Sequence, residues 1–448
     1  MKRSLFFKTT VLGLGVAALA AISWAEGQTP ALPRNPSSVI TALSVLTVQI
    51  PDGAGAEILR HGQELMRAGD CVSCHMRKGG EPLSGGLGLK TPFGVIYSSN
   101  ITPDPETGIG RWTPDQFYRA MHDGHGANGE NLYPAFPYPW FRTMSRADDD
   151  ALLAYIKTTP PVHYTPPANQ LIFPLNFRSL VAGWNLLFLK TRSFASASEK
   201  SEVWNRGAYL VNGPGHCGAC HTPKNAFGAD QAGHEFRGAV IDNWTAPDLT
   251  GDIRTGLGAW SEGDISEYLK TGRNAHAGAG GAMADVVTYS TSLLTDADRT
   301  AIAVYLKSLP AGPSSQSAVA IDAASISRGH EIYSDACASC HLENGKGQPG
   351  LFPPLGNNAM VQQLDATGLE HLILAGTSIA ATPSRPSPLS MPAFSWKLTD
   401  REIADVATYV RNSWGNRAPP LNPDDVAALR KQLDLQKPRR TDNSGDQD

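Results

Sequence analysis

The residues of this chain best suited to chemistry are its six cysteines, which fall in three copies of one pattern. The copies read CVSCH (71–75), CGACH (217–221) and CASCH (337–341), and no cysteine lies outside them. Cysteines three positions apart lie on one side of a helical turn, so both can form thioethers with the vinyl groups of one porphyrin. The histidine that follows can then ligate the iron. The spacing therefore predicts three covalently bound haem c groups, attached through Cys71, Cys74, Cys217, Cys220, Cys337 and Cys340 and ligated axially by His75, His221 and His341.

Two other roles for the cysteines are weaker. Six cysteines in an exported chain could form three disulfides, and neighbouring cysteine pairs could be zinc half-sites. Neither role explains a histidine directly after every second cysteine. Three matches that together use every cysteine favour haem c, and an export signal would agree, since haem c is attached outside the cytoplasm.

The N-terminus predicts export. Three basic residues within the first eight precede an apolar run over residues 11–22, and a small-x-small site ends at Ala25. This is the pattern of a secretory signal peptide over residues 1–25; an uncleaved anchor is the alternative. No later stretch of the sequence is long and apolar enough to cross a bilayer. The formal net charge of −4 argues against a nucleic-acid partner.

The similarity between the three segments extends beyond the cysteines. A short helix-like stretch with a glycine precedes each motif, and a second helix with a capping hydroxyl follows after a long irregular stretch. An aromatic side chain recurs at one place in each second helix, where it can pack against the glycine of the first. The recurring residues are the caps Ser145, Thr295 and Thr399 and the aromatics Tyr155, Tyr305 and Tyr409.

These repeats predict a mainly α fold of three tandem domains, each arranged as helix, CxxCH motif, loops and helix around one haem. A linker that is unusually apolar follows the first domain, and a small polar linker follows the second. The apolar linker is expected either to pack between domains or to lie at a membrane surface. The expected bounds are 50–165, 201–310 and 325–418 for the domains, 166–200 and 311–324 for the linkers, and 419–448 for a polar tail.

The second face of each iron needs a separate prediction, because electron-transfer haem c usually takes a methionine sulfur there. Met283 and Met391 each lie ahead of the last helix of their domain, where a ligand loop is expected. We therefore predict that both ligate haem iron. In the first domain, counting the corresponding distance from His75 leads to Phe136, which cannot donate to iron.

Four stretches of the sequence carry a family resemblance. They read TPFGVIYSSNITPDPETGIGRW (91–112), LYPAFPYPWF (132–141), HCGACHTPKNAFG (216–228) and MPAFSWKLTDREIADVATYVRNSWGN (391–416). Together with the repeated motif, they make the chain resemble three class I cytochrome c domains in tandem. More specifically, it resembles the three-haem cytochrome c subunit of bacterial membrane-bound dehydrogenases, whose relatives serve alcohol, gluconate, sorbitol, fructose, aldehyde or N-heterocycle oxidation.

The resemblance implies an electron relay rather than an enzyme. Electrons would come from a periplasmic dehydrogenase catalytic subunit of the quinoprotein, flavin or molybdenum type and leave to ubiquinone or a terminal oxidase. The chain would lie at the periplasmic side of the bacterial cytoplasmic membrane, in contact with the membrane surface. The residues agree, because the sequence has no nucleotide fingerprint, nucleophile motif or further metal cluster that could activate an organic substrate.

Phe136 departs from the family, since the similar alcohol dehydrogenase subunits often have methionine there. Met144 or Met121 could replace it, although the repeat aligns them with the core positions Leu294 and Leu269. The remaining alternatives are a histidine or a five-coordinate iron under an aromatic lid, which would favour gas sensing or peroxide reduction as a second function. The candidate histidines are His122, His125 and His163.

Two further features receive structural interpretations. His216 abuts Cys217, but the proximal role belongs to His221, so we expect a polar surface residue. Residues 148–150 are three aspartates at a helix N-terminus, where stabilisation of the helix dipole explains them without a docking role.

Overall fold

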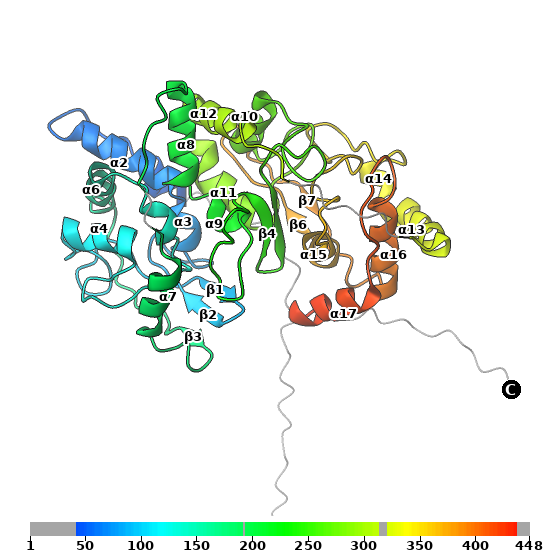
Figure 1. Ribbon diagram of the computed structural model, residues 1–448, viewed down its shortest axis with the longest axis horizontal. Helices are drawn as coiled ribbons and strands as arrows, with labels where there is room; N and C mark the ends of the chain where they lie inside the picture. The colour runs from blue at the N-terminus through cyan, green and yellow to red at the C-terminus, as the bar shows by residue number, and fades with distance from the viewer. Residues whose placement is uncertain (1–41, 191–192, 313–319, 437–448) are drawn as a thin grey trace, which may run out of the picture.

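The computed structural model describes residues 42–190, 193–312 and 320–436. The predicted signal peptide, residues 1–25, lies outside these ranges. Figure 1 shows three helical units in a row, from the blue and cyan first unit through the green second unit to the yellow and red third unit. The mainly α class and the tandem arrangement predicted from the repeats are confirmed. Within the described ranges, no helix is long and apolar enough to cross a membrane.

Each unit is built on a crossed pair formed by its first and last helices. Helices α2, α8 and α13 precede the three cysteine motifs, and α6, α12 and α16 close the units. Their bounds are Ala56–Ala68 with Arg146–Ile156, Glu202–Asn212 with Asp296–Lys307, and Ala323–Ala336 with Asp400–Val410.

A glycine makes each crossing possible. A methyl group added at Gly62 would lie 2.0 Å from the carbonyl oxygen of Ala151. The corresponding distances are 1.9 Å at Gly207 and 2.2 Å at Gly329, and the Cβ of the recurring tyrosine lies within 2.9 Å each time. No side chain fits at such distances, so glycine is required for the helices to approach this closely.

The last helices begin at the predicted caps. The hydroxyls of Ser145, Thr295 and Thr399 accept hydrogen bonds from backbone N–H groups three residues on, at 3.0–3.3 Å. Acidic side chains occupy each first turn, where they complement the helix dipole.

Short elements fill the space between the paired helices. The cysteine motifs form single turns, and a middle helix follows in each unit. The single turns are α3 (Cys71–Cys74), α9 (Gly218–His221) and α14 (Ala338–His341), and the middle helices are α4 (Pro114–Asp123), α10 (Glu262–Thr271) and α15 (Thr367–Ala375). The remaining short elements before the last helices are α5 (Tyr138–Phe141), α11 (Gly281–Tyr289) and η1 (Thr291–Leu293).

Three small antiparallel sheets accompany the helices. In the first unit, β1 (Gly88–Thr91) pairs with β2 (Gly94–Tyr97), and β3 (Gln170–Leu171) extends the sheet by pairing with β2. In the second, β4 (Arg237–Ile241) pairs with β5 (Trp244–Asp248). In the third, β6 (Thr377–Ser378) pairs with β7 (Ser390–Met391), and Thr377 lies opposite Met391.

Two segments expected to flank the domains are instead part of them. Within the apolar linker, β3 joins the first sheet, and α7 (Leu180–Phe188) follows it. Within the expected polar tail, α17 (Pro423–Gln432) packs against α15 and α16. Its Arg430 is buried, and the guanidinium donates to Asp400 and to backbone carbonyls, which neutralises its charge. The first core likewise extends N-terminally past residue 50, to residues 42–46.

Polar contacts join consecutive domains. Between the first and second, the Thr143 hydroxyl donates to the Asn212 carbonyl at 2.6 Å, and the Tyr209 hydroxyl donates to Asp148. Asp148 therefore connects two domains, which its expected role in helix stabilisation alone did not foresee. Between the second and third, the N–H of Ala380 donates to the Ala279 carbonyl at 3.1 Å.

Candidate haem sites

Each of the three motif histidines makes the same kind of hydrogen bond, from its ring to a backbone carbonyl. The Nδ1 atoms of His75, His221 and His341 lie 2.7, 2.7 and 3.0 Å from the carbonyl oxygens of residues 99, 247 and 353. Burial also lowers the pKa of each imidazole, which favours the neutral form. A neutral ring that donates from Nδ1 keeps Nε2 free as the lone-pair donor, which is the state required of an iron ligand.

Each of the six cysteines lies on or beside a single helical turn, and none forms a disulfide with another. Cys74 of the first domain and Cys220 of the second line the same cavity. No group of three histidine, cysteine or acidic side chains that could hold a metal ion occurs in the described part of the chain. The cysteine arrangement is that expected for thioether attachment, and the weaker alternatives, three disulfides or zinc half-sites, have no counterpart among the described residues.

A continuous cavity of about 2210 Å³ connects the motifs. Its wall includes both cysteines and the histidine of the second and third motifs, and it reaches the first motif at Cys74. Apolar side chains such as Trp260 and Phe394 dominate the rest of the wall, as a porphyrin requires. The cavity therefore fits haem c at the second and third motifs, and at the first motif the cysteines and histidine of the pattern themselves carry the assignment.

The two predicted methionines lie on this wall. Met283 is on α11, where it packs against the apolar core of the second domain. Met391 is in β7, beside Gly376, whose φ of 71° and distance of 2.6 Å from a would-be Cβ to the Met391 carbonyl oxygen require glycine. Both methionines are thus held at the cavity by local structure, and their ligation of iron remains a prediction.

The first domain differs at this point. Phe136 lies half-buried against the first core, with its ring 5.6 Å from the Phe141 ring and 6.2 Å from the Tyr138 ring. Met121 and Met144 are buried in the same core, as the repeat alignment predicts. Phe136 is therefore part of a cluster of aromatic rings.

The candidate histidines of the first domain have distinct surroundings. His122 Nε2 lies 2.8 Å from Asp149 Oδ2, and its ring stacks on Tyr118. His163 is two-thirds exposed beside Asp104. His125 is largely buried, and its Nδ1 has no hydrogen-bond partner in the described part of the protein. In the described part of the chain, the Phe136 ring contacts the rings of Tyr138 and Phe141 and none of these three histidine rings.

The prediction for His216, a polar residue on the surface, is wrong. It is not a polar surface side chain: burial lowers its pKa to about 4, and the ring stacks on Phe141 at 4.9 Å. Its turn packs against the first domain, since Trp140 contacts Gly218. Its place directly before the second cysteine motif was the only sequence signal that it would lie at a domain junction.

Comparisons with known proteins agree with these sites. The cytochrome c family profile matches residues 59–160, 205–310 and 326–414. The chain is 41% identical to the gluconate 2-dehydrogenase cytochrome c subunit of Pantoea cypripedii, over 86% of this chain and 92% of that one. It is 40% identical to the cytochrome c subunit of quinone alcohol dehydrogenase from Gluconobacter oxydans, over 84% and 83% of the two chains. It is 36% identical to the fructose dehydrogenase cytochrome subunit of Gluconobacter japonicus, over 87% of each. The predicted resemblance is thereby confirmed.

Proposed function

Because the chain belongs to the cytochrome c family and carries three covalent haem c groups, we propose that it is the electron-transfer subunit of a dehydrogenase complex. The observation that carries the proposal is the cavity that connects the three attachment motifs within one chain. Sites in series, with Cys74 and Cys220 of the first two on one cavity wall, suit stepwise electron transfer better than three independent functions.

In this proposal each haem supplies a reversible one-electron change at its iron. His75, His221 and His341 would hold the irons through Nε2, oriented by the carbonyls of residues 99, 247 and 353. Met283 and Met391 would supply thioether sulfur to the second and third haems, which favours a high reduction potential. The apolar wall excludes water and so limits the reorganisation that accompanies a change of charge.

The electron donor is a periplasmic dehydrogenase catalytic subunit of the quinoprotein, flavin or molybdenum type. The named relatives support this class, because they are cytochrome subunits of gluconate, alcohol and fructose dehydrogenases. The acceptor is ubiquinone or a terminal oxidase at the periplasmic side of the cytoplasmic membrane. In this arrangement the chain is not an enzyme on its own.

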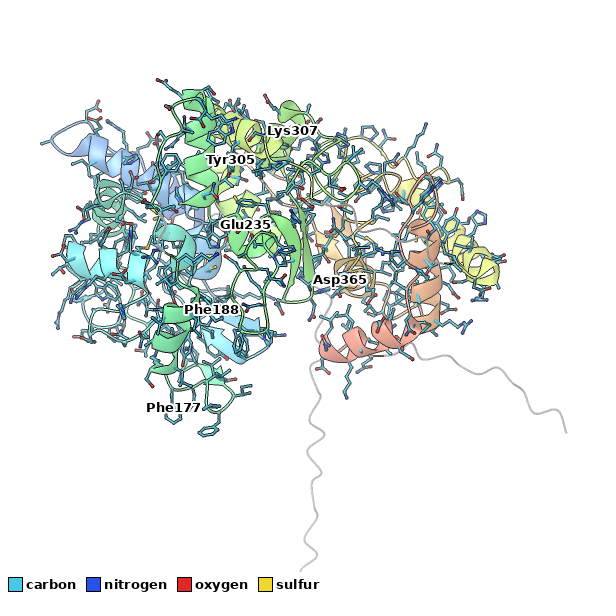
Figure 2. All side chains as sticks on the ribbon, viewed as in Figure 1. Phe177, Phe188, Glu235, Tyr305, Lys307 and Asp365 are labelled. Carbon is cyan, nitrogen blue, oxygen red and sulfur yellow. The ribbon has the colours of Figure 1, made fainter. Side chains whose placement is uncertain are left out.

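The exposed face of the former linker supports contact with a membrane surface. Phe173 and Leu186 are 80% and 87% exposed, whereas the opposite face of α7 is anchored by Val181 and by the hydrogen bond from Trp184 Nε1 to the Phe227 carbonyl. Figure 2 shows another side chain of this segment, that of Phe177, at the lower edge of the molecule.

The charged residues of this segment also support contact with a membrane surface. The sequence has no acidic residue between Asp150 and Glu199, whereas Arg178 and Lys190 flank the exposed apolar side chains. An apolar face with basic flanks is typical of segments that bind anionic lipid. We therefore assign the exposed face of this segment to the membrane surface, while its other face packs against the second domain at Phe227.

Co-purification tests the complex. The full chain is isolated from its own membranes in mild detergent, and proteins that accompany it are identified by mass spectrometry. A flavin, quinoprotein or molybdenum dehydrogenase that reduces all three haems with its substrate is the expected result. Recovery of the chain alone, with no dehydrogenase able to reduce it, would contradict the proposal.

Vesicle flotation tests the membrane contact. The haem-loaded chain should float with vesicles that contain anionic phospholipid, and Phe173→Glu combined with Leu186→Glu should weaken this binding by about tenfold. Ile253→Glu is the matched control, because Ile253 is also exposed but lies in another domain. Equal binding of all variants would exclude this segment as the contact.

A further inference from the structure

The first domain contributes a buried aromatic side chain to the second domain. Trp140 belongs to α5 of the first domain, and its side chain is buried. The ring lies in the hydrophobic core of the second domain, in the same cluster as Leu210 and Ile265 and 5.7 Å from the Phe236 ring. Aromatic side chains of this size dominate the energetics of cores and interfaces. One residue of the first domain is therefore a core residue of the second.

The Trp140 ring also contacts the turn that carries the second cysteine motif. Gly218 follows Cys217 in the sequence CGACH. A Cβ atom built on Gly218 would lie 2.1 Å from Cη2 and 2.3 Å from Cζ2 of Trp140. Carbon atoms that are not bonded to each other pack at about 3.5–4.0 Å. The indole therefore occupies the space that any other residue at position 218 would need for its side chain.

The other two motifs show that the pattern itself does not require this glycine. Val72 and Ala338 stand where the second motif has Gly218. Gly218 belongs to the helical turn α9 and does not have a positive φ, so its backbone conformation would accept other residues. The glycine of the second motif is thus explained by the tryptophan of the first domain.

Two further contacts hold the same turn against the first domain. The ring of Phe141, the next residue of α5, stacks at 4.9 Å on His216, which directly precedes the second motif. The Thr143 hydroxyl donates to the Asn212 carbonyl, at the end of α8. The turn of the second motif is therefore fixed from its preceding residues as well as from within.

Trp140 differs from these neighbours because it also lines the continuous cavity. Both cysteines and the histidine of the second motif lie on the wall of this cavity, and so does Cys74 of the first motif. Phe141 and Thr143 are not among the described residues that line it. Trp140 therefore joins the two domains and also bounds the space in which the second haem fits.

We propose that Trp140 is a positioning residue for electron transfer between the first and second haems. It holds the turn of the second motif against the first domain and keeps water from the cavity wall beside that turn. The inference rests on the proposed electron relay, but its test needs no partner dehydrogenase. In the step concerned, one electron passes from a ferrous to a ferric iron within the chain, so one haem is oxidised as the other is reduced.

Two effects follow from the position of the indole. Electron transfer between two sites weakens steeply as the gap between them widens, so a small shift of the second attachment turn should slow it. An apolar wall also keeps water away from the haem, and water favours the more charged, oxidised form. Loss of the Trp140 ring is therefore expected to slow the transfer and to lower one reduction potential.

Pulse radiolysis of the haem-loaded full chain measures the rate, because it delivers single electrons and records how they redistribute among the haems. Trp140→Leu should slow one phase of this redistribution by about tenfold. Redox titration of the same variant should show one of the three potentials lowered. Trp396→Leu is the matched control, since Trp396 is 70% exposed in the third domain, and it should change neither the rate nor the potentials.

Thr143→Val separates the role of the indole from that of the junction as a whole. The change removes the hydrogen bond to Asn212 while it keeps the shape of the side chain. Docking of the two domains is weakened, but the cavity wall stays intact. The rate and the three potentials should therefore stay as in the wild type.

Gly218→Ala tests the contact from its other partner. The change gives the second motif the same residue that the third has at Ala338, so haem attachment should be retained. The new methyl group collides with the Trp140 ring, so the same phase should slow. Gly218→Ala combined with Trp140→Leu should not add the two effects, because both changes disturb one contact.

Three results would overturn the proposal. The first is an unchanged rate with unchanged potentials in a folded Trp140→Leu protein that carries three haems; Gly218→Ala supplies this comparison if Trp140→Leu does not fold. The second is an equal slowing by Thr143→Val, which would assign the effect to domain docking in general. The third is additive slowing by Gly218→Ala and Trp140→Leu. If any of these appears while a dehydrogenase and its substrate still reduce all three haems, the relay stands and only this inference falls.

Discussion

The first and second domains share a scaffold but differ in the loop that faces the iron. Both cross their first and last helices at a glycine, cap the last helix with a hydroxyl and hold the proximal histidine through a carbonyl. Ahead of the last helix, the second domain has the two-turn α11 with Met283, and the first has the single turn α5 after Phe136. Because the scaffold contacts do not involve this loop, the iron surroundings can change while the fold stays the same.

The shared scaffold can be disrupted by replacing the glycine at which the first and last helices cross. Gly207→Val and Gly62→Val should each cost about 3–5 kcal/mol in the free energy of unfolding, because the new side chain meets backbone at about 2 Å. Because thioethers keep the haem attached, the affected domain should lose the packed surroundings of its haem, seen as an altered absorbance spectrum for one haem in three. Gly263→Val is the control, since only the Ser261 hydroxyl oxygen, at 3.6 Å, lies within 4 Å of its would-be Cβ. An unaltered haem spectrum in a stably folded Gly207→Val protein would contradict the importance of the crossing.

The difference between the two loops can be removed by a substitution in the second domain. Met283→Phe gives the second domain the residue of the first, so one haem potential should fall by roughly 0.1–0.3 V as its sulfur ligand is lost. Spectroelectrochemical titration measures the potential, and carbon monoxide uptake should rise by one equivalent. Met391→Phe should do the same to a different haem. Unchanged potentials in both variants would show that these methionines only line the cavity.

The third domain differs from the other two by the packing of α17, which a buried carboxyl makes pH-dependent. Burial raises the pKa of Glu370 to about 7, with Asp425 and Asp365 adding to the effect and Arg411 opposing it. A folded-state pKa above the unfolded value of about 4.3 means that the ionised group destabilises the fold. The third domain should therefore gain stability as the pH falls from about 7 toward 4.3.

Substitution of this carboxyl should remove the effect. Glu370→Gln is expected to stabilise the third domain by about 1–2 kcal/mol at pH 8 and to flatten its stability between pH 5 and 8. Thermal unfolding followed at several pH values measures this, and Glu331→Gln, on the exposed face of α13, is the control. An unaltered pH profile for Glu370→Gln would assign the dependence to another group.

The junction between the compared domains gives the smallest effect. Tyr209→Phe removes the hydroxyl that donates to Asp148, which should cost about 1 kcal/mol of coupling between the domains. Burial alone would raise the pKa of Asp148, but hydrogen bonds from Tyr209, His61 and Ser145 lower it overall. Calorimetry should show the unfolding of the two domains separating by a few degrees. Superimposable traces would mean that other contacts, such as Thr143 to Asn212, hold the junction.

The features that could be predicted from the sequence are those that depend on a few neighbouring residues. The cysteine motifs, the caps at Ser145, Thr295 and Thr399 and the glycine crossings each follow from a few neighbouring residues, and the structure has all of them. The position of Phe136 could be counted from His75, because the repeat supplied a reference.

What could not be predicted depends on contacts distant in the sequence. The segment after residue 418 reads as polar, yet α17 packs on the third domain because Asp400 and distant carbonyls satisfy Arg430. His216 and Asp148 are polar residues on their own, and only the neighbouring domain makes them junction residues. Exposed or buried placement of such side chains is decided by partners that no local pattern contains.

The cavity wall shared by Cys74 and Cys220 has a consequence for the reduction potentials. Each haem changes its charge by one when it is reduced, and charges in an apolar surrounding interact more strongly than in water. Reduction of one of the first two haems is therefore expected to lower the potential of the other, so that the two titrate as a coupled pair.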